Sequence, residues 1–229
     1  MKVLGLLGGM SWESTVAYYR LINEETRARL GGLHSAPLLL WSADFAEVEA
    51  LQVAGRWDDA GAQLAQAAQA LEAAGAELLV LCTNTMHKVA GAIEASVGIP
   101  LVHIVDSVAE AVAGAGMRRV GLLGTRFTME DPFWSDRMAG HGIEVRVPRA
   151  EQRELVHRVI YEELCVGVLR DESRAAFVEL IEHMTAAGAE GVVLGCTEIE
   201  LLVGPADTTA PLFPTTALHV RSAVDAALQ

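Results

Sequence analysis

The chain is poor in cysteine, and the few cysteines that it has show no pairing pattern. Its 229 residues include three, at positions 82, 165 and 196. No CxxC spacing and no cluster of cysteine and histidine indicates a structural metal site. An odd and sparse count argues against a disulfide framework and fits a reducing compartment.

Basic and aromatic residues are also scarce. The 17 basic residues are outnumbered by 30 acidic ones, which gives a formal net charge of -13. This acidity argues against a nucleic-acid partner, because proteins that bind a phosphate backbone carry a basic face. Aromatic residues make up 5% of the chain and hydrophobic residues 52%, so the core must consist mainly of alanine, leucine and valine.

Long apolar runs are absent. No stretch reaches the ~18 residues of a transmembrane helix, and Gly8-Gly9 interrupts the first apolar run before a signal-peptide core could form. We therefore expect a soluble cytoplasmic protein that binds neither membranes nor nucleic acid.

Two short phrases occur twice, in the same order and at nearly the same spacing. Gly5-Leu-Leu-Gly-Gly9 returns as Gly121-Leu-Leu-Gly-Thr125, and Cys82-Thr83 returns as Cys196-Thr197. The interval from glycine to cysteine is 77 residues in the first copy and 75 in the second. This repetition predicts a duplicated α/β unit in which each half offers one thiol.

Short apolar runs alternate with helical patterns along the whole chain, which is typical of parallel βαβ units. We predict strands at residues 2–7, 37–42, 77–81, 100–104, 119–123, 191–194 and 211–213, and helices at residues 13–30, 60–74, 83–93, 107–115, 153–168 and 174–187, with a further helix at the end. The predicted fold has two pseudo-symmetric Rossmann-like halves with parallel sheets and an active site in the cleft between them. The first half is residues 1–103 plus 210–229, and the second is residues 104–209.

Cys82 and Cys196 both fall where a strand ends and a helix is predicted to begin, which is where parallel α/β sheets bind ligands. A helix N-terminus favours the thiolate, so each cysteine could act as acid or base near neutral pH. The alternative for either residue alone is packing, since cysteine is often a small buried hydrophobe. We expect Cys165, which lies within a helical pattern, to pack or to line a pocket.

Other candidates carry weaker signals. The turn at Gly8-Gly9 could cradle an anion or could be a tight strand-to-helix turn, and these roles are compatible. The sequence around Ser11 lacks the second glycine of a nucleophile elbow, so we interpret Ser11 as a helix cap or hydrogen-bond donor. We expect His87 on a helix surface or a pocket edge, and the other six histidines carry no motif.

Three ordered motifs resemble the signatures of the aspartate/glutamate racemase family. They are Gly8-Gly-Met-Ser-Trp-Glu-Ser-Thr15, Leu81-Cys-Thr-Asn-Thr-Met-His-Lys88 and Gly195-Cys-Thr-Glu-Ile199. The resemblance implies an amino-acid racemase that needs no pyridoxal phosphate or other cofactor and that forms homodimers. It implies Cys82 and Cys196 as the acid/base thiols, and it implies that the following residues bind the amino-acid substrate: Met10, Ser11, Thr83, Asn84, Thr85, Thr125 and Thr197.

The chain departs from the family pattern where aspartate racemases hold the distal carboxylate with basic side chains. Residues 44–50 contain no lysine or arginine, and the next basic residue is Arg56. Residues 161–165 contain no basic residue either. Because an unpaired buried charge is costly, we expect a neutral or cationic substrate side chain to be preferred, unless Arg56, Arg126 or another arginine reaches the site.

Two other readings stay open from the sequence. One is a cysteine-dependent isomerase or lyase of the same fold, similar to maleate isomerase or a decarboxylase. The other is an amino-acid-binding protein without catalysis. A two-thiol mechanism predicts a bell-shaped dependence of kcat/KM on pH.

Overall fold

The computed structural model describes residues 1–229 as two compact units. Unit 1 comprises residues 1–104 and 219–229, and unit 2 comprises residues 105–218. The chain passes between them within α5 (Ile104–Gly114) and again within α11 (Thr215–Leu228). None of the helices combines the length and the hydropathy that a membrane crossing requires.

Unit 1 has a four-stranded parallel sheet in the order β2-β1-β3-β4. Its strands are β1 (Leu4–Gly8), β2 (Leu38–Ser42), β3 (Leu78–Leu81) and β4 (Leu101–Val102). Its other elements are α1 (Trp12–Leu30), α2 (Phe45–Val53), α3 (Trp57–Ala73), the 3-10 helix η1 (Thr85–Val89) and α4 (Ala90–Glu94).

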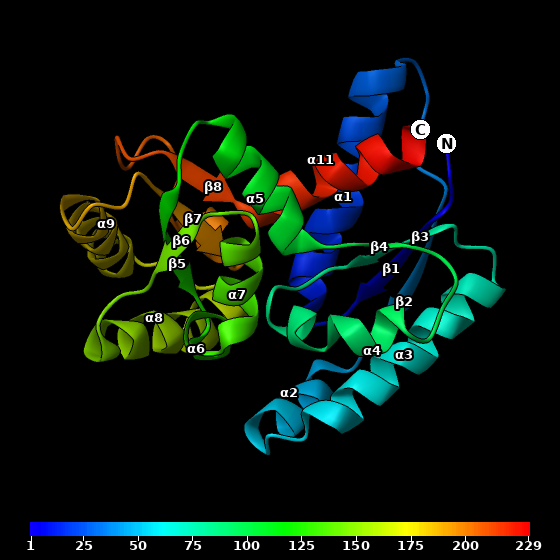
Figure 1. The fold of residues 1–229 in the computed structure, drawn as a ribbon, viewed down its shortest axis with the longest axis horizontal. Helices are drawn as coiled ribbons and strands as arrows, with labels where there is room; N and C mark the ends of the chain where they lie inside the picture. Colours follow the sequence, from blue (N-terminus) through cyan, green and yellow to red (C-terminus); the bar gives the residue numbers. More distant parts are fainter. The chain divides into compact units, whose positions relative to one another are not determined.

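The central strands of this sheet are apolar on both faces, as a sheet covered on both sides requires. Leu4, Leu6 and Val80 pack with α1 and α11 on one face, whereas Leu79 and Leu81 pack with α3 and α4 on the other. Figure 1 shows these helices on either side of the sheet. Because the central strands are packed on both faces, the residues that follow their carboxyl ends are held in defined positions.

Unit 2 repeats this topology with the strand order β6-β5-β7-β8, again all parallel. Its strands are β5 (Arg119–Gly124), β6 (Glu144–Arg146), β7 (Gly191–Gly195) and β8 (Leu212–Pro214). Its helices are α6 (Arg126–Glu130), α7 (Pro132–Gly140), α8 (Ala150–Glu162), η2 (Leu164–Val166), α9 (Asp171–Ala186) and α10 (Ile199–Leu202). The predicted fold class, two similar α/β halves with parallel sheets, is confirmed.

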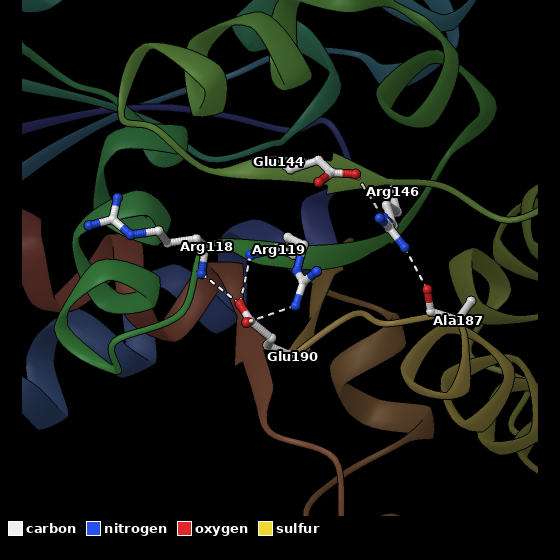
Figure 2. Close-up of polar contacts among 6 residues, drawn as sticks. All are labelled: Arg118, Arg119, Glu144, Arg146, Ala187 and Glu190. Carbon is white, nitrogen blue, oxygen red and sulfur yellow. Dashed lines mark hydrogen bonds and ion pairs between the residues drawn. The ribbon is translucent and has the colours of Figure 1, made fainter.

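One carboxylate in each unit ties together the starts of the two central strands. The Glu190 carboxylate accepts hydrogen bonds from the backbone N–H groups of Arg118 and Arg119 at 2.7 and 2.9 Å, as Figure 2 shows. These bonds lower the pKa of Glu190. In unit 1 the Glu77 carboxylate makes the equivalent hydrogen bond, accepting the N–H of Val3 at 2.8 Å. The duplication therefore extends to the sheet edge opposite the cysteines.

The sequence did not predict α2, α6, α7 or β6, which are short and weakly periodic. The division between the units also falls at different residues from those expected. We placed residues 210–218 in the first half, but β8 pairs with β7, so this segment completes the sheet of unit 2.

Candidate active site

In unit 1, the predicted site residues meet at the carboxyl edge of the sheet. The Cys82 N–H donates to the Leu7 carbonyl at 2.9 Å, so this thiol-bearing residue lies directly beside the end of β1. The turn at Gly9 adopts a φ of +85°, and a side chain there would collide with the backbone of Ala43. Only glycine fits both conditions, so the tight-turn interpretation holds.

Ser11 is the N-cap of α1, as predicted. Its hydroxyl accepts the Ser14 N–H at 3.2 Å, and its carbonyl accepts the Thr15 hydroxyl, which in turn accepts the Gly9 N–H at 2.8 Å. The neighbouring Met10 side chain packs into the apolar core. Met10 can therefore offer a substrate only its backbone.

Thr83, Asn84 and Thr85 follow Cys82 and lead into η1. Asn84 and Thr85 are buried. His87 is buried as well, which corrects the expected position on a helix surface or a pocket edge. Its Nδ1 donates to the Thr83 carbonyl at 2.7 Å, and its Nε2 accepts the Ile104 N–H at 3.2 Å. This pair of bonds fixes the tautomer with the proton on Nδ1.

In unit 2, Thr125 and Cys196 follow two residues that pair with each other, Gly124 of β5 and Gly195 of β7. They therefore leave the sheet side by side. Thr125 caps α6 by accepting the Thr128 N–H at 3.3 Å. Thr197, next to the cysteine, accepts a hydrogen bond from the Thr216 hydroxyl at 3.0 Å.

A carboxylate of the third motif, which carries no signal of its own in the sequence, contacts the second thiol. Cys196 Sγ donates to Oε2 of the buried Glu198 at 2.9 Å. Two residues later, Glu200 accepts the Thr216 N–H at 3.0 Å, and burial raises the pKa of Glu200 to about 7. In the sequence, Glu198 is marked only by its place two positions after the strand-end Cys196.

The expectation that helix dipoles poise both thiols near neutral pH is wrong. Burial raises the pKa of the Cys82 thiol. Burial, followed by the charges of Glu198 and Cys165, raises that of Cys196. The elements after the cysteines are a five-residue 3-10 helix and a four-residue helix, too short for a strong dipole. Desolvation therefore dominates, and both residues rest as thiols.

The structure also assembles a group of buried histidines that the sequence left scattered. The His87 ring centroid lies 4.6 Å from that of His103 and 5.7 Å from that of His219. His219 donates from Nε2 to the Val102 carbonyl and accepts the Tyr18 hydroxyl at Nδ1, both at 2.8 Å. Burial lowers its pKa to about 4, so this ring is neutral at physiological pH.

The arginines considered for a distal carboxylate have other partners. Arg56 pairs with Asp59 at 2.7 Å, and Arg126 lies 3.8 Å from Glu154. Asp44, in the acidic segment, caps α2 through the Ala46 N–H.

The two sheet edges, each with one cysteine just after its third strand, occur in a chain that matches a known family. The family model described as Asp/Glu/Hydantoin racemase matches residues 7–223. The chain belongs to this family. Membership of a racemase family supports an isomerase, and the matched residues include both cysteine motifs.

Solved structures agree with this assignment. A candidate Asp/Glu racemase from Yersinia pestis is 53% identical, with 100% of each chain covered and a TM-score of 0.94. An aspartate racemase homologue from Pyrococcus horikoshii OT3 is 36% identical over 100% of each chain, with a TM-score of 0.88. Unliganded arylmalonate decarboxylase shares the fold alone, at 14% identity, with a TM-score of 0.52 over 99% of this chain and 93% of its own.

Proposed function

We propose that this protein racemises an amino acid without a cofactor, using Cys82 and Cys196 as a pair of acid/base groups. The observation that carries the proposal is the placement of one free thiol at the same position in each unit, just after the third strand; Cys82 is buried and Cys196 is half-buried. Family membership supports the racemase class. The chain has only two lysines, Lys2 and Lys88, and Lys88 lies over the Trp57 ring, which gives little scope for a pyridoxal Schiff base.

In the proposed reaction, the resting enzyme has two thiols, and the Glu198 carboxylate accepts the hydrogen bond of the Cys196 thiol. As substrate reacts, Cys196 passes its proton to Glu198, and its sulfur takes the proton from Cα. Cys82 then gives its own proton to the opposite face of Cα and becomes a thiolate. The proton on Glu198 and the charge on Cys82 return to the resting state through solvent, so protons balance over a turnover. For the other enantiomer, the steps run in reverse.

The remaining residues suit the binding of the amino-acid backbone. Ser11, Thr83, Asn84 and Thr85 offer hydroxyl, amide and backbone groups at the edge of unit 1, and Thr125 and Thr197 do so in unit 2. Donors around the α-carboxylate would stabilise the negative charge that develops as the Cα proton leaves. We further propose cytoplasmic location and a homodimer.

We expect Glu198→Gln to lower kcat about 100-fold, because glutamine can accept the thiol hydrogen bond but cannot take its proton. KM should change less than about 3-fold, since Glu198 acts on the thiol rather than on bound substrate. The matched control is Glu200→Gln, which replaces a half-buried carboxyl group that hydrogen-bonds to Thr216 instead. An equal loss in both variants, or a rise in KM alone, would contradict the proton-accepting role.

The decisive test of function is wild-type solvent deuterium incorporation at Cα, followed by chiral chromatography, with the L-forms of aspartate, glutamate, homoserine and lysine. We expect exchange and formation of the other enantiomer without loss of substrate. Because the segment that begins at Asp44 is acidic, and Arg56 and Arg126 lie beside Asp59 and Glu154, we expect kcat/KM to be higher for homoserine or lysine than for aspartate.

The outcomes of that experiment separate the proposals. A strong preference for aspartate would refute the substrate class and leave racemisation intact. Loss of carbon dioxide or of the amino group would indicate a lyase. Binding of an amino acid, measured as a raised melting temperature, with no exchange at Cα would indicate a protein that binds without catalysis.

A further inference from the structure

The backbone on either side of Cys82 is anchored by three hydrogen bonds. The Cys82 N–H donates to the Leu7 carbonyl of β1 at 2.9 Å, and the Thr83 N–H donates back to the Leu81 carbonyl at 2.8 Å. Cys82 is therefore the middle residue of a three-residue turn at the end of β3. The third anchor is the Thr83 carbonyl, which accepts a hydrogen bond from the His87 ring at 2.7 Å. Two anchors thus come from the sheet, and one comes from a side chain.

The same histidine ring contacts the start of another element. His87 Nε2 accepts the N–H of Ile104, the first residue of α5, at 3.2 Å. The first N–H groups of a helix have no partner within the helix, and Ile104 is fully buried, so bulk water does not reach this one. The His87 ring therefore joins the segment after Cys82 to the first turn of α5, which lies 17 positions further along the chain.

Both ring nitrogens of His87 are occupied by backbone groups. Nδ1 donates to one carbonyl, and Nε2 accepts one N–H. An imidazole with one nitrogen donating and the other accepting is neutral, so neither nitrogen is left to activate a thiol. The Cys82 thiol instead makes a weak hydrogen bond to the Val80 carbonyl at 3.7 Å. These contacts favour a role for His87 through the backbone over a role in proton transfer.

Buried rings hold the His87 side chain in this orientation. The centroids of His103 and His219 lie 4.6 and 5.7 Å from that of His87, at interplanar angles of 63° and 70°. His219 is itself fixed by hydrogen bonds to Val102 and Tyr18. All three histidines are at most 6% exposed. The His87 ring has little room to turn, so its two hydrogen bonds are held in place.

We propose that His87 is a positioning residue for Cys82: its neutral ring clamps the backbone after the cysteine to the start of α5 and so holds the thiol in place for proton exchange with Cα. The inference rests on the proposed function, because it assigns a task that concerns one of the two thiols. Proton transfer requires the two heavy atoms at hydrogen-bond distance. A displacement of about 1 Å is enough to lower the rate roughly 100-fold.

The second unit has no such ring at the corresponding position. His87 is the fifth residue after Cys82, and the fifth residue after Cys196 is Leu201, which is 60% exposed. The repeat that places the two cysteines alike therefore does not extend to the clamp. Removing the His87 ring should affect proton transfer at Cys82 and leave the chemistry of Cys196 unchanged.

Two substitutions at position 87 separate the two hydrogen bonds. The amide of asparagine reaches about as far as Nδ1 and can still donate to the Thr83 carbonyl, whereas that of glutamine reaches about as far as Nε2 and can still accept the Ile104 N–H. We expect His87→Gln to lower kcat about 100-fold and His87→Asn to lower it less than about 5-fold. His219→Gln is the matched control, because its ring belongs to the same group but makes its hydrogen bonds to Val102 and Tyr18.

Isotope effects distinguish positioning from a general loss of stability. A smaller fraction of folded protein lowers the rates for both enantiomers and leaves their isotope effects unchanged. If only the Cys82 step is slower, the primary isotope effect of an α-deuterated substrate on kcat/KM rises for the enantiomer that Cys82 deprotonates. It falls for the other enantiomer, because a slow second step at Cys82 lets the first step at Cys196 reverse. We expect these opposite changes in His87→Gln, and in neither His87→Asn nor His219→Gln.

Amide hydrogen exchange tests the clamp without catalysis. The Ile104 amide, followed by NMR, should exchange faster in His87→Asn, which loses the bond to Ile104, than in His87→Gln. Equal amide exchange in the two variants, equal values of kcat, or isotope effects that change together for both enantiomers would overturn the proposal. A wild type that exchanges no Cα hydrogen would refute the proposed function and with it the catalytic part of this inference, whereas the amide exchange tests the clamp in either case.

Discussion

Replacing Cys82 or Cys196 by serine is expected to lower kcat/KM for racemisation by at least about 1,000-fold. A serine hydroxyl is a far weaker acid than a thiol, so it can neither take the Cα proton nor return one at neutral pH. In the proposed mechanism each thiol serves one face of Cα, and neither can substitute for the other. Polarimetry on both enantiomers of the best substrate measures the loss.

Cys165→Ser is the control for this experiment. Cys165 lies close enough to Cys196 to raise the pKa of its thiol, but we give it no proton to transfer, so its variant should retain activity within about 3-fold. Cys82→Ala should accompany Cys82→Ser, because a hydroxyl in the fully buried Cys82 position carries its own desolvation cost. If either serine variant racemises at the wild-type rate, the two-thiol mechanism is wrong.

Acidification is expected to destabilise unit 1 through His219. Its pKa in the folded protein is about 4 because the ring is buried, whereas in the unfolded chain it is near 6.5. As pH falls from 6.5 to 4, the unfolded chain takes up the proton first, so stability is complete above pH 6.5 and is lost below it. A shift of this size corresponds to a loss of roughly 3 kcal/mol in the free energy of unfolding.

Urea unfolding at a series of pH values from neutral to acid measures this effect. His219→Gln is the matched variant, because its amide can still donate to the Val102 carbonyl and accept the Tyr18 hydroxyl. Carboxylates titrate in both proteins, so the difference between the two pH profiles isolates His219. Parallel profiles for wild type and His219→Gln would show that the buried ring does not control acid stability.

The parts of the fold that the sequence predicted are those with strong local patterns. Leu78–Leu81 is a fully buried run that only a central strand explains, and the nineteen residues of α1 end at Gly31, which adopts a φ of +77°. By contrast, β6 has only three residues, and it is a strand because β5 offers it hydrogen bonds. Such pairing is a tertiary effect that no local pattern reveals.

The sequence likewise predicted some properties of the candidate site and not others. The repeat placed Cys82 and Cys196 at strand ends because strand positions follow from the sequence. The protonation states did not follow, since they depend on how deeply the sulfurs are buried and on the Glu198 carboxylate. The histidine group joins residues 87, 103 and 219 through ring contacts that span 132 positions of the chain, and no spacing in the sequence indicates it.

The last helix of the chain has a consequence for the order of folding. Val220, Ala223, Val224 and Ala227 of α11 complete the apolar layer against which β1, β3 and α1 pack. Unit 1 contains residues 1–104, but it lacks this apolar layer until residues 219–229 have also been made. During synthesis on the ribosome, therefore, most of unit 1 emerges first but its core is completed last. Unit 2 can fold while the apolar core of unit 1 is still exposed.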